Sequence, residues 1–114
     1  MKQNLTEDAI QARAELERRA TRAEQLLRRL GNRQRLIILC LLSDTELSVG
    51  ELNRQVALSQ SALSQHLAQL RRAGVVATRR ESQTIYYRLR DQRVLSLLTA
   101  LCDLGAPAGG QIDA

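Results

Sequence analysis

The sequence predicts a mainly α-helical fold with one small β-hairpin, in the order α-α-α-α-β-β-α. Apolar residues recur at helical spacing as far as residue 73, and they alternate with a period of two between residues 75 and 90. Helical spacing then returns from residue 92. A hairpin that directly follows two short helices joined by a tight turn is a wing, so the predicted fold is a winged helix-turn-helix.

The size and composition fit one small soluble domain. The chain has 114 residues, of which 44% are hydrophobic and 25% are charged, as in ordinary globular proteins. Tyr86 and Tyr87 are its only aromatic residues, so the core must be aliphatic, which favours helices over a β-sandwich. We expect a single domain over residues 1–105 and a disordered tail over residues 106–114.

The positive charge is concentrated in the middle of the chain. The net charge is +5, and residues 51–93 carry eight arginines against three acidic residues. An anionic partner would therefore bind this region, which leaves nucleic acid, an acidic membrane surface and an acidic protein as candidates.

Nothing in the sequence indicates export or a membrane span. The first residues lead into a charged segment, unlike a signal peptide. The longest apolar run, residues 36–42, has seven residues, which is too short to cross a bilayer. We therefore expect a cytoplasmic protein without a membrane partner, whose two cysteines are thiols at rest.

The first part of the chain contains two predicted helices. Apolar residues form a heptad-type seam over residues 6–30, and Gly31 ends the helix. A second helix over about 33–42 holds the apolar run, so we expect it to be buried nearly all round. A short extended link follows at residues 46–47. The seam consists of Leu16, Ala20, Ala23, Leu27 and Leu30.

Capping signals mark the two helices of the helix-turn-helix. Ser48 and Glu51 stand three positions apart, which is the pattern of a capping box, and they predict a short helix to about Ala57. Ser59 is the expected N-cap of the next helix, over about 60–73, which stops at the glycine that follows.

The wing and a last helix complete the fold. Residues 75–80 and 84–90 are the predicted strands, around a polar turn at residues 81–83. Asp91 is expected to cap a helix over about 92–104. The apolar residues of this helix cover more than one face, so it should pack on its own core and on a partner as well.

The outer face of the predicted helix 60–73 is rich in serine and glutamine. With Leu63, Leu67 and Leu70 turned inward, this face lacks the Glu and Lys that a solvated surface helix normally carries. Short polar side chains near the N-terminus of a helix in the major groove can reach base edges and phosphates. We therefore favour double-stranded DNA as the partner.

Several segments resemble a known family. Residues 59–67 (SQSALSQHL) and 70–76 (LRRAGVV), with the apolar run 36–42 and residues 46–52 (ELSVGEL), resemble the ArsR/SmtB superfamily of bacterial repressors, in particular its metal-independent, thiol-based branch. The similarity covers about residues 20–104. It implies a homodimer joined through the first and last helices, which binds a near-palindromic operator.

The predicted DNA contacts come from the recognition helix and the wing. Glutamine suits adenine and serine suits either base, so the N-terminal half of the helix has the side chains that read bases. The wing is expected to hold phosphate or the minor groove. A purely structural role is an open alternative for the histidine of the helix. The candidates are Gln60, Ser61, Ser64, Gln65, His66 and Arg72 in the helix, and Arg79, Arg80 and Gln83 in the wing.

Cys40 and Cys102 have two interpretations. A free cysteine is most often a small buried hydrophobe. The resemblance implies instead a redox-sensing dithiol switch, in which reactive sulfur species or oxidants bridge the two cysteines and the repressor leaves DNA. The second cysteine of the family lies about one helical turn later than Cys102, so a direct disulfide and a longer polysulfide link both remain open.

No metal, cofactor or catalytic site is predicted. Metal-sensing relatives carry cysteines where this chain has residues 48–50, or histidines in the last helix, where it has only Asp91 and Asp103. The chain has no nucleophile triad, paired carboxylates or phosphate-binding glycine loop, so we do not expect an enzyme. A metal-sensing repressor of the same fold and a winged-helix protein–protein module remain alternatives.

Overall fold

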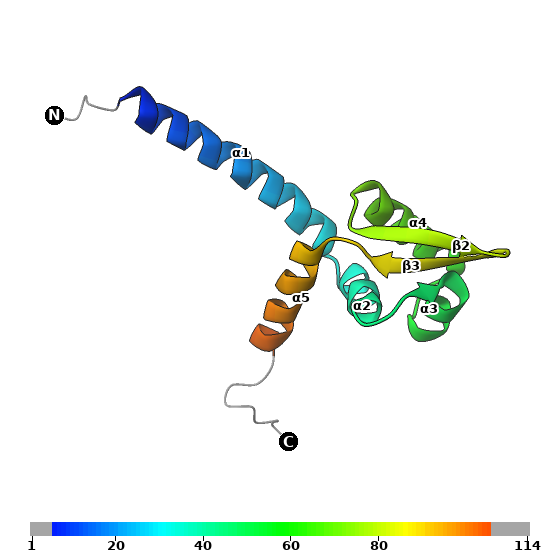
Figure 1. Cartoon of the computed structure of the whole chain (residues 1–114). Coiled ribbons are helices and arrows are strands. Elements are labelled where there is room, and N and C mark those ends of the chain that lie inside the picture. Colours follow the sequence, from blue (N-terminus) through cyan, green and yellow to red (C-terminus); the bar gives the residue numbers. More distant parts are fainter. Residues whose placement is uncertain (1–5, 106–114) are drawn as a thin grey trace, which may run out of the picture. The chain divides into compact units, whose positions relative to one another are not determined.

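The structure is a computed structural model that describes residues 6–105 (Figure 1). The predicted tail, residues 106–114, lies outside the described residues, as do residues 1–5. The chain forms two compact units. One unit ends at Asn32 and contains α1 (Glu7–Leu30), and the other begins at Arg33 and contains the remaining elements.

The second unit has the predicted helix-turn-helix and wing. Its sheet contains one strand that the sequence did not reveal, because β1 is only two residues long and is too short to show alternation. β1 pairs with β3, which gives an antiparallel sheet in the order β1-β3-β2. The elements are α2 (Arg33–Leu42), β1 (Leu47–Ser48), α3 (Val49–Gln55), α4 (Gln60–Arg72), β2 (Val76–Glu81), β3 (Thr84–Leu89) and α5 (Gln92–Gly105).

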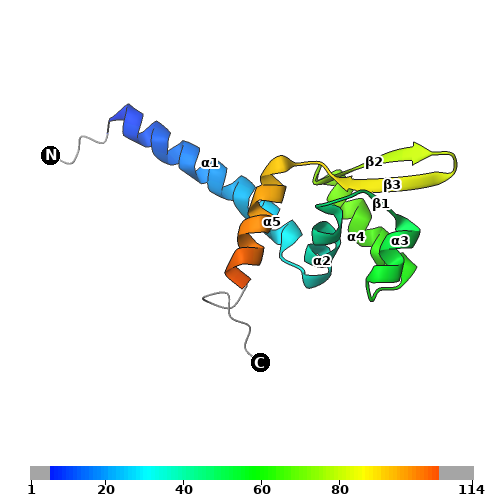
Figure 2. The same cartoon turned by 60° about the horizontal axis from the view of Figure 1, so that its bottom comes forward.

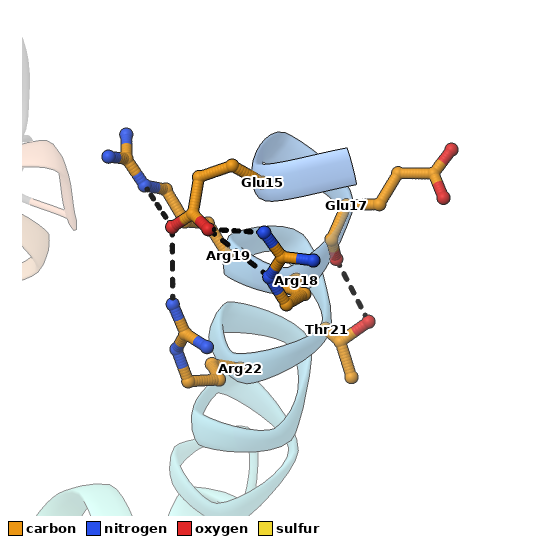
Figure 3. A network of polar contacts seen from close by, with 6 residues as sticks. All are labelled: Glu15, Glu17, Arg18, Arg19, Thr21 and Arg22. Carbon is orange, nitrogen blue, oxygen red and sulfur yellow. Dashed lines mark hydrogen bonds and ion pairs between the residues drawn. The ribbon is translucent and has the colours of Figure 1, made fainter. Parts of the chain in front are cut away.

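Ion pairs run along the surface of α1 (Figure 3). The carboxylate of Glu15 lies 2.8 Å from Arg18, 3.3 Å from Arg19 and 3.8 Å from Arg22. Exposed pairs three or four positions apart, as Glu15 is from Arg18 and Arg19, contribute about 0.3–0.5 kcal/mol each. They support a helix of which the only buried residue in the described range is Leu30.

The helix caps predicted from the sequence are present in the second unit. The Ser48 hydroxyl accepts from the amide of Glu51 at 3.1 Å, and the Glu51 carboxylate accepts from the amide of Ser48 at 2.8 Å. Ser59 accepts from the amide of Ala62 at 3.1 Å. The short helix α3 ends two residues earlier than predicted, because Val56 adopts an extended conformation and is buried.

The core of the second unit is aliphatic, as the composition predicts. The expectation that α2 is buried nearly all round is wrong, since this helix buries one face and leaves Cys40 exposed. A unit of this size can surround only part of the surface of a helix. The buried side chains are Ile38, Leu39, Leu42, Leu52, Val56, Leu63, Leu67, Leu70, Val75, Val76, Val94 and Leu98.

The hairpin of β2 and β3 runs beside α4, and its turn reaches beyond the helices of the second unit (Figure 2). Its register runs from Val76 opposite Leu89 to Glu81 opposite Thr84. The turn is therefore two residues long and not three as predicted, with Ser82 in the left-handed conformation at a φ of 58°.

Gly74 connects α4 to the wing through a Schellman motif. The amide of Gly74 donates to the carbonyl of Arg71 at 3.0 Å, and the amide of Val75 donates to the carbonyl of Leu70 at 3.0 Å. Gly74 has a φ of 76°, a conformation that favours glycine. This turn sets the direction in which the wing leaves α4.

Replacement of Gly74 by alanine should destabilise the fold by about 1–2 kcal/mol, the cost of a left-handed residue that carries a Cβ. The new Cβ would meet no close atom, since the nearest is the Arg90 guanidinium at 3.9 Å, so the loss reports backbone strain alone. Urea unfolding measures it. Gly50→Ala, inside α3, is the control and should not destabilise. Equal stabilities of the two variants would contradict this role of Gly74.

Candidate nucleic-acid interface

Helix α4 presents the predicted polar face to solvent. Its three leucines are buried, as the helical period requires. His66 is partly buried, whereas the other candidates of the helix are exposed. These are Gln60, Ser61, Ser64, Gln65 and Arg72.

An open hollow of about 430 Å³ lies between α4 and β3. It is lined by Ser64, Ala68, Arg71, Arg72 and Tyr87. Two guanidinium groups and two hydroxyls are the donors that bind phosphate oxygens. Arg71 and Tyr87 were not among the predicted contacts. The alternation of the strand indicated that one tyrosine packs inward, but only the register shows which one lies beside α4.

The two arginines of the wing have different surroundings. Arg79 donates from Nε to the Glu46 carboxylate at 2.6 Å and from Nη1 to Glu81 at 2.8 Å. Its guanidinium also lies over the ring of Tyr86, 4.6 Å from the centroid. The hydrogen bond from Arg79 lowers the pKa of Glu46, and both carboxylates raise the pKa of Arg79. Arg79 thus ties the hairpin to the segment before β1.

Arg80 lies on the opposite face of the hairpin. Successive strand residues point to opposite faces, and Arg80 stands opposite Ile85 in the register. Tyr87 shares that face and lines the hollow beside α4. Arg80 is therefore directed to the same side as α4, whereas Arg79 is directed away from it. Gln83 lies exposed in the turn at the tip.

His66 is bound to a side chain of α2. Arg35 donates from Nε to Nδ1 of His66 at 3.1 Å and from Nη2 to Oε1 of Gln69. Burial, and then the charge of Arg35, lower the pKa of His66 and keep its ring neutral. His66 therefore has a structural contact with a side chain of another helix, and not with the backbone as the structural alternative expected, while its contact with DNA stays a prediction.

The lowered pKa of His66 gives stability a defined pH dependence. The neutral ring stabilises the fold in full above about pH 6.5, and this stability decreases as the pH falls through the lowered pKa. Urea unfolding over the range from about pH 8 to 5 should show a larger loss for the wild type than for His66→Asn. Equal losses for the two proteins would exclude a contribution from His66.

Cys40 of α2 and Cys102 of α5 lie side by side. Both are free thiols and both are exposed in the single chain, so neither is a buried hydrophobe. Partial burial raises the pKa of Cys40, and the neighbouring Cys102 raises it further through its charge and a hydrogen bond. The fold thus brings the two predicted cysteines into contact within one chain, in spite of their offset from the family pattern.

Metal ligands are not gathered anywhere in the described range. Within residues 6–105, no three side chains of His, Cys, Asp or Glu lie close enough together to hold a metal ion. In the same range, every helix is too short or too polar to cross a membrane.

A helix-turn-helix with a polar second helix and a basic hairpin beside it defines a winged-helix DNA-binding regulator. Residues 32–78 match the family described as bacterial regulatory protein, arsR family. The transcriptional activator HlyU of Vibrio cholerae is 52% identical over 87 residues, which cover 76% of this chain and 81% of that protein. The biofilm growth-associated repressor of Xylella fastidiosa is 42% identical over 89 residues, which cover 78% of each chain. The chain therefore belongs to the arsR family.

Solved structures agree with this assignment. Reduced HlyU from Vibrio cholerae matches with a TM-score of 0.76 at 49% identity, over 82% of this chain and 98% of that one. The repressor BigR from Xylella fastidiosa matches with a TM-score of 0.77 at 39% identity, over 83% and 97%. The predicted winged-helix fold and family resemblance are confirmed. Because its relatives are transcriptional regulators, the chain is a DNA-binding regulator and not an enzyme.

Proposed function

We propose that the protein is a cytoplasmic, dimeric repressor that leaves its operator when Cys40 and Cys102 become bridged. The observation that carries this proposal is the contact between two free thiols of one chain, one on α2 and one on α5. DNA binding alone would not need this pair. A covalent bond between two packed helices would change their relative position, which is what a switch requires.

The exposed apolar side chains support a homodimer. On α1, Leu16 and Leu27 are 59% and 57% exposed, and on α5, Leu104 is 81% exposed. Large apolar side chains that gather on a surface usually mark an interface, and those of α1 follow the predicted heptad seam. A twofold dimer presents two copies of α4, so it would bind two half-sites of a near-palindromic operator.

The positions of α4, the hollow and the hairpin suit the following contacts between each half of the dimer and DNA. Helix α4 would enter the major groove, and the hollow formed with Arg71, Arg72 and Tyr87 would hold a phosphate. Arg80 and Gln83 would reach the backbone or the minor groove beside it. The bases would be read by Gln60, Ser61, Ser64 and Gln65.

Replacement of Gln65 and Arg80 should separate base contacts from phosphate contacts. Gln65→Ala should weaken operator binding by about 1–3 kcal/mol and leave binding to random duplex nearly unchanged. Arg80→Ala should weaken binding to every duplex and reduce the salt slope by about one. Band-shift titrations at several salt concentrations measure both effects.

The matched control for this test is Arg79→Ala, on the neighbouring residue. Because Arg79 is bound to two carboxylates, its loss should change the salt slope less than the loss of Arg80. Equal losses from Gln65→Ala and Arg80→Ala on all duplexes would contradict the docking.

With a peroxide the bridge can close in two steps. Either thiol can react first, and the steps are the same with Cys102 or Cys40 as the first. When Cys102 is the first, its thiolate takes one oxygen and releases hydroxide or alkoxide. The Cys40 thiol then attacks the sulfenic sulfur, which forms the disulfide and releases water.

A persulfide can close the same bridge. The Cys102 thiolate takes the terminal sulfur and releases a thiolate, and Cys40 then attacks the inner sulfur and displaces hydrosulfide. If Cys40 itself carries a persulfide when it attacks, the product is a trisulfide. Hydrosulfide is the leaving group in this reaction too. A persulfide donor can therefore produce either the direct disulfide or the longer trisulfide bridge.

Serine variants test the switch. Wild-type protein treated with a persulfide donor should lose about a hundredfold in operator affinity, equivalent to about 2.8 kcal/mol. Cys40→Ser and Cys102→Ser should bind like the reduced protein and should not respond. Mass spectrometry under non-reducing conditions should find the link within one chain. If the persulfide donor still releases the double serine variant from the operator, the thiol mechanism is excluded. If thiol-binding metals, and not the donor, release the wild-type protein from the operator, a metal sensor is favoured.

A further inference from the structure

Arg35 of α2 binds two side chains of α4. Its side chain donates to His66 at 3.1 Å and also to Gln69. These acceptors are three positions apart in α4, so they lie on one side of the helix. On α2, Arg35 belongs to the same face as the buried Ile38 and Leu39, at its N-terminal end.

The guanidinium geometry makes this contact directional. Arginine donates through a planar fork and cannot accept, so His66 must offer an unprotonated Nδ1 and carry its proton on Nε2. Two donors that meet two acceptors on successive turns oppose rotation of α4 about its axis. The DNA-facing Gln65 directly precedes His66 in the chain, so its direction depends on this rotation.

Cys40 lies on a different side of α2. It is five positions after Arg35, which corresponds to about 7.5 Å along the helix axis and about 140° around it. Figures 1 and 2 show α2 between α5 on one side and the pair of α3 and α4 on the other. The thiol pair and the arginine contact therefore act on one short helix from two directions.

We propose that Arg35 is a positioning residue that fixes the rotation of α4 and transmits closure of the Cys40–Cys102 bridge to it. The transmission rests on the proposed thiol switch, whereas the positioning does not. Bridging shifts α2 relative to α5, which displaces the guanidinium from His66 and Gln69. Helix α4 then loses the orientation in which both copies fit the operator.

Arg35→Gln and its matched control Arg33→Gln test the proposal on the full-length protein. Both variants remove one positive charge from the first turn of α2, and Arg33 is exposed. Nitrogen-detected NMR of reduced wild type should show His66 with its proton on Nε2. Arg35→Gln should lose this preference, and Arg33→Gln should keep it.

Operator affinity is the second measurement. Reduced Arg35→Gln should bind the operator about tenfold more weakly than reduced wild type, and the ratio between reduced and bridged affinities should fall by about tenfold. Arg33→Gln should preserve this ratio. Arg35→Lys, which retains the charge and loses the fork, should behave like Arg35→Gln. If Arg35→Gln does not fold, Arg35→Lys replaces it in both measurements.

The outcomes separate this proposal from the switch itself. If wild type forms the bridge and leaves DNA while Arg35→Gln keeps the full ratio, the switch stands and transmission through Arg35 is wrong. If wild type forms no bridge, the switch and the transmission are both wrong. The His66 signal and the reduced affinity then decide the positioning role, and a wild-type ring protonated on Nδ1 would overturn it.

Discussion

The packing of α2 is the constraint on which the rest of the second unit depends. The ten residues of α2 supply a buried face for the core, a contact with α4 and a contact with α5. Ile38, Leu39 and Leu42 serve the first need, with each at most 2% exposed. Arg35 and Cys40 serve the other two, because they stand on different sides of the same helix. A displacement of α2 would therefore change its contacts with α4 and with α5 together.

Acidic and basic side chains are distributed unevenly around α4 and the wing. Helix α4 carries no acidic residue in its first turn, and its last turn holds Arg71 and Arg72 beside the hollow. On the hairpin, the carboxylates of Glu46 and Glu81 are directed to Arg79, on the face turned away from α4. These two carboxylates, one before β1 and one in the wing, thus brace the hairpin through Arg79 and not through Arg80.

The local signals of the sequence predicted most of the fold. Ser48 with Glu51, Ser59 and Gly74 each determine a helix end through bonds within a few residues, so their patterns could be recognised without a structure. The buried leucines of α4 follow from the helical period alone. The polar face and the candidate residues on it follow from the same period.

Contacts between distant segments could not be predicted in this way. The ion pair of Arg79 with Glu46 and the bond of Arg35 with His66 join residues more than thirty positions apart. Their geometry depends on how β1 and α2 pack. The pairing of Cys40 with Cys102 follows from the family resemblance and from no local pattern, because it depends on how α5 packs against α2. The sequence did not predict the exposed side of α2, because a run of apolar residues does not show how many other elements pack around the helix.

Hydrogen exchange of the backbone amides of α4 tests most directly whether α2 couples the thiol pair to α4. Exchange is compared between the reduced and the bridged wild-type protein, both without DNA. We predict faster exchange around His66 in the bridged protein, because α4 has lost its two bonds to Arg35. Unchanged exchange throughout α4, in bridged protein that no longer binds its operator, would contradict the coupling through α2.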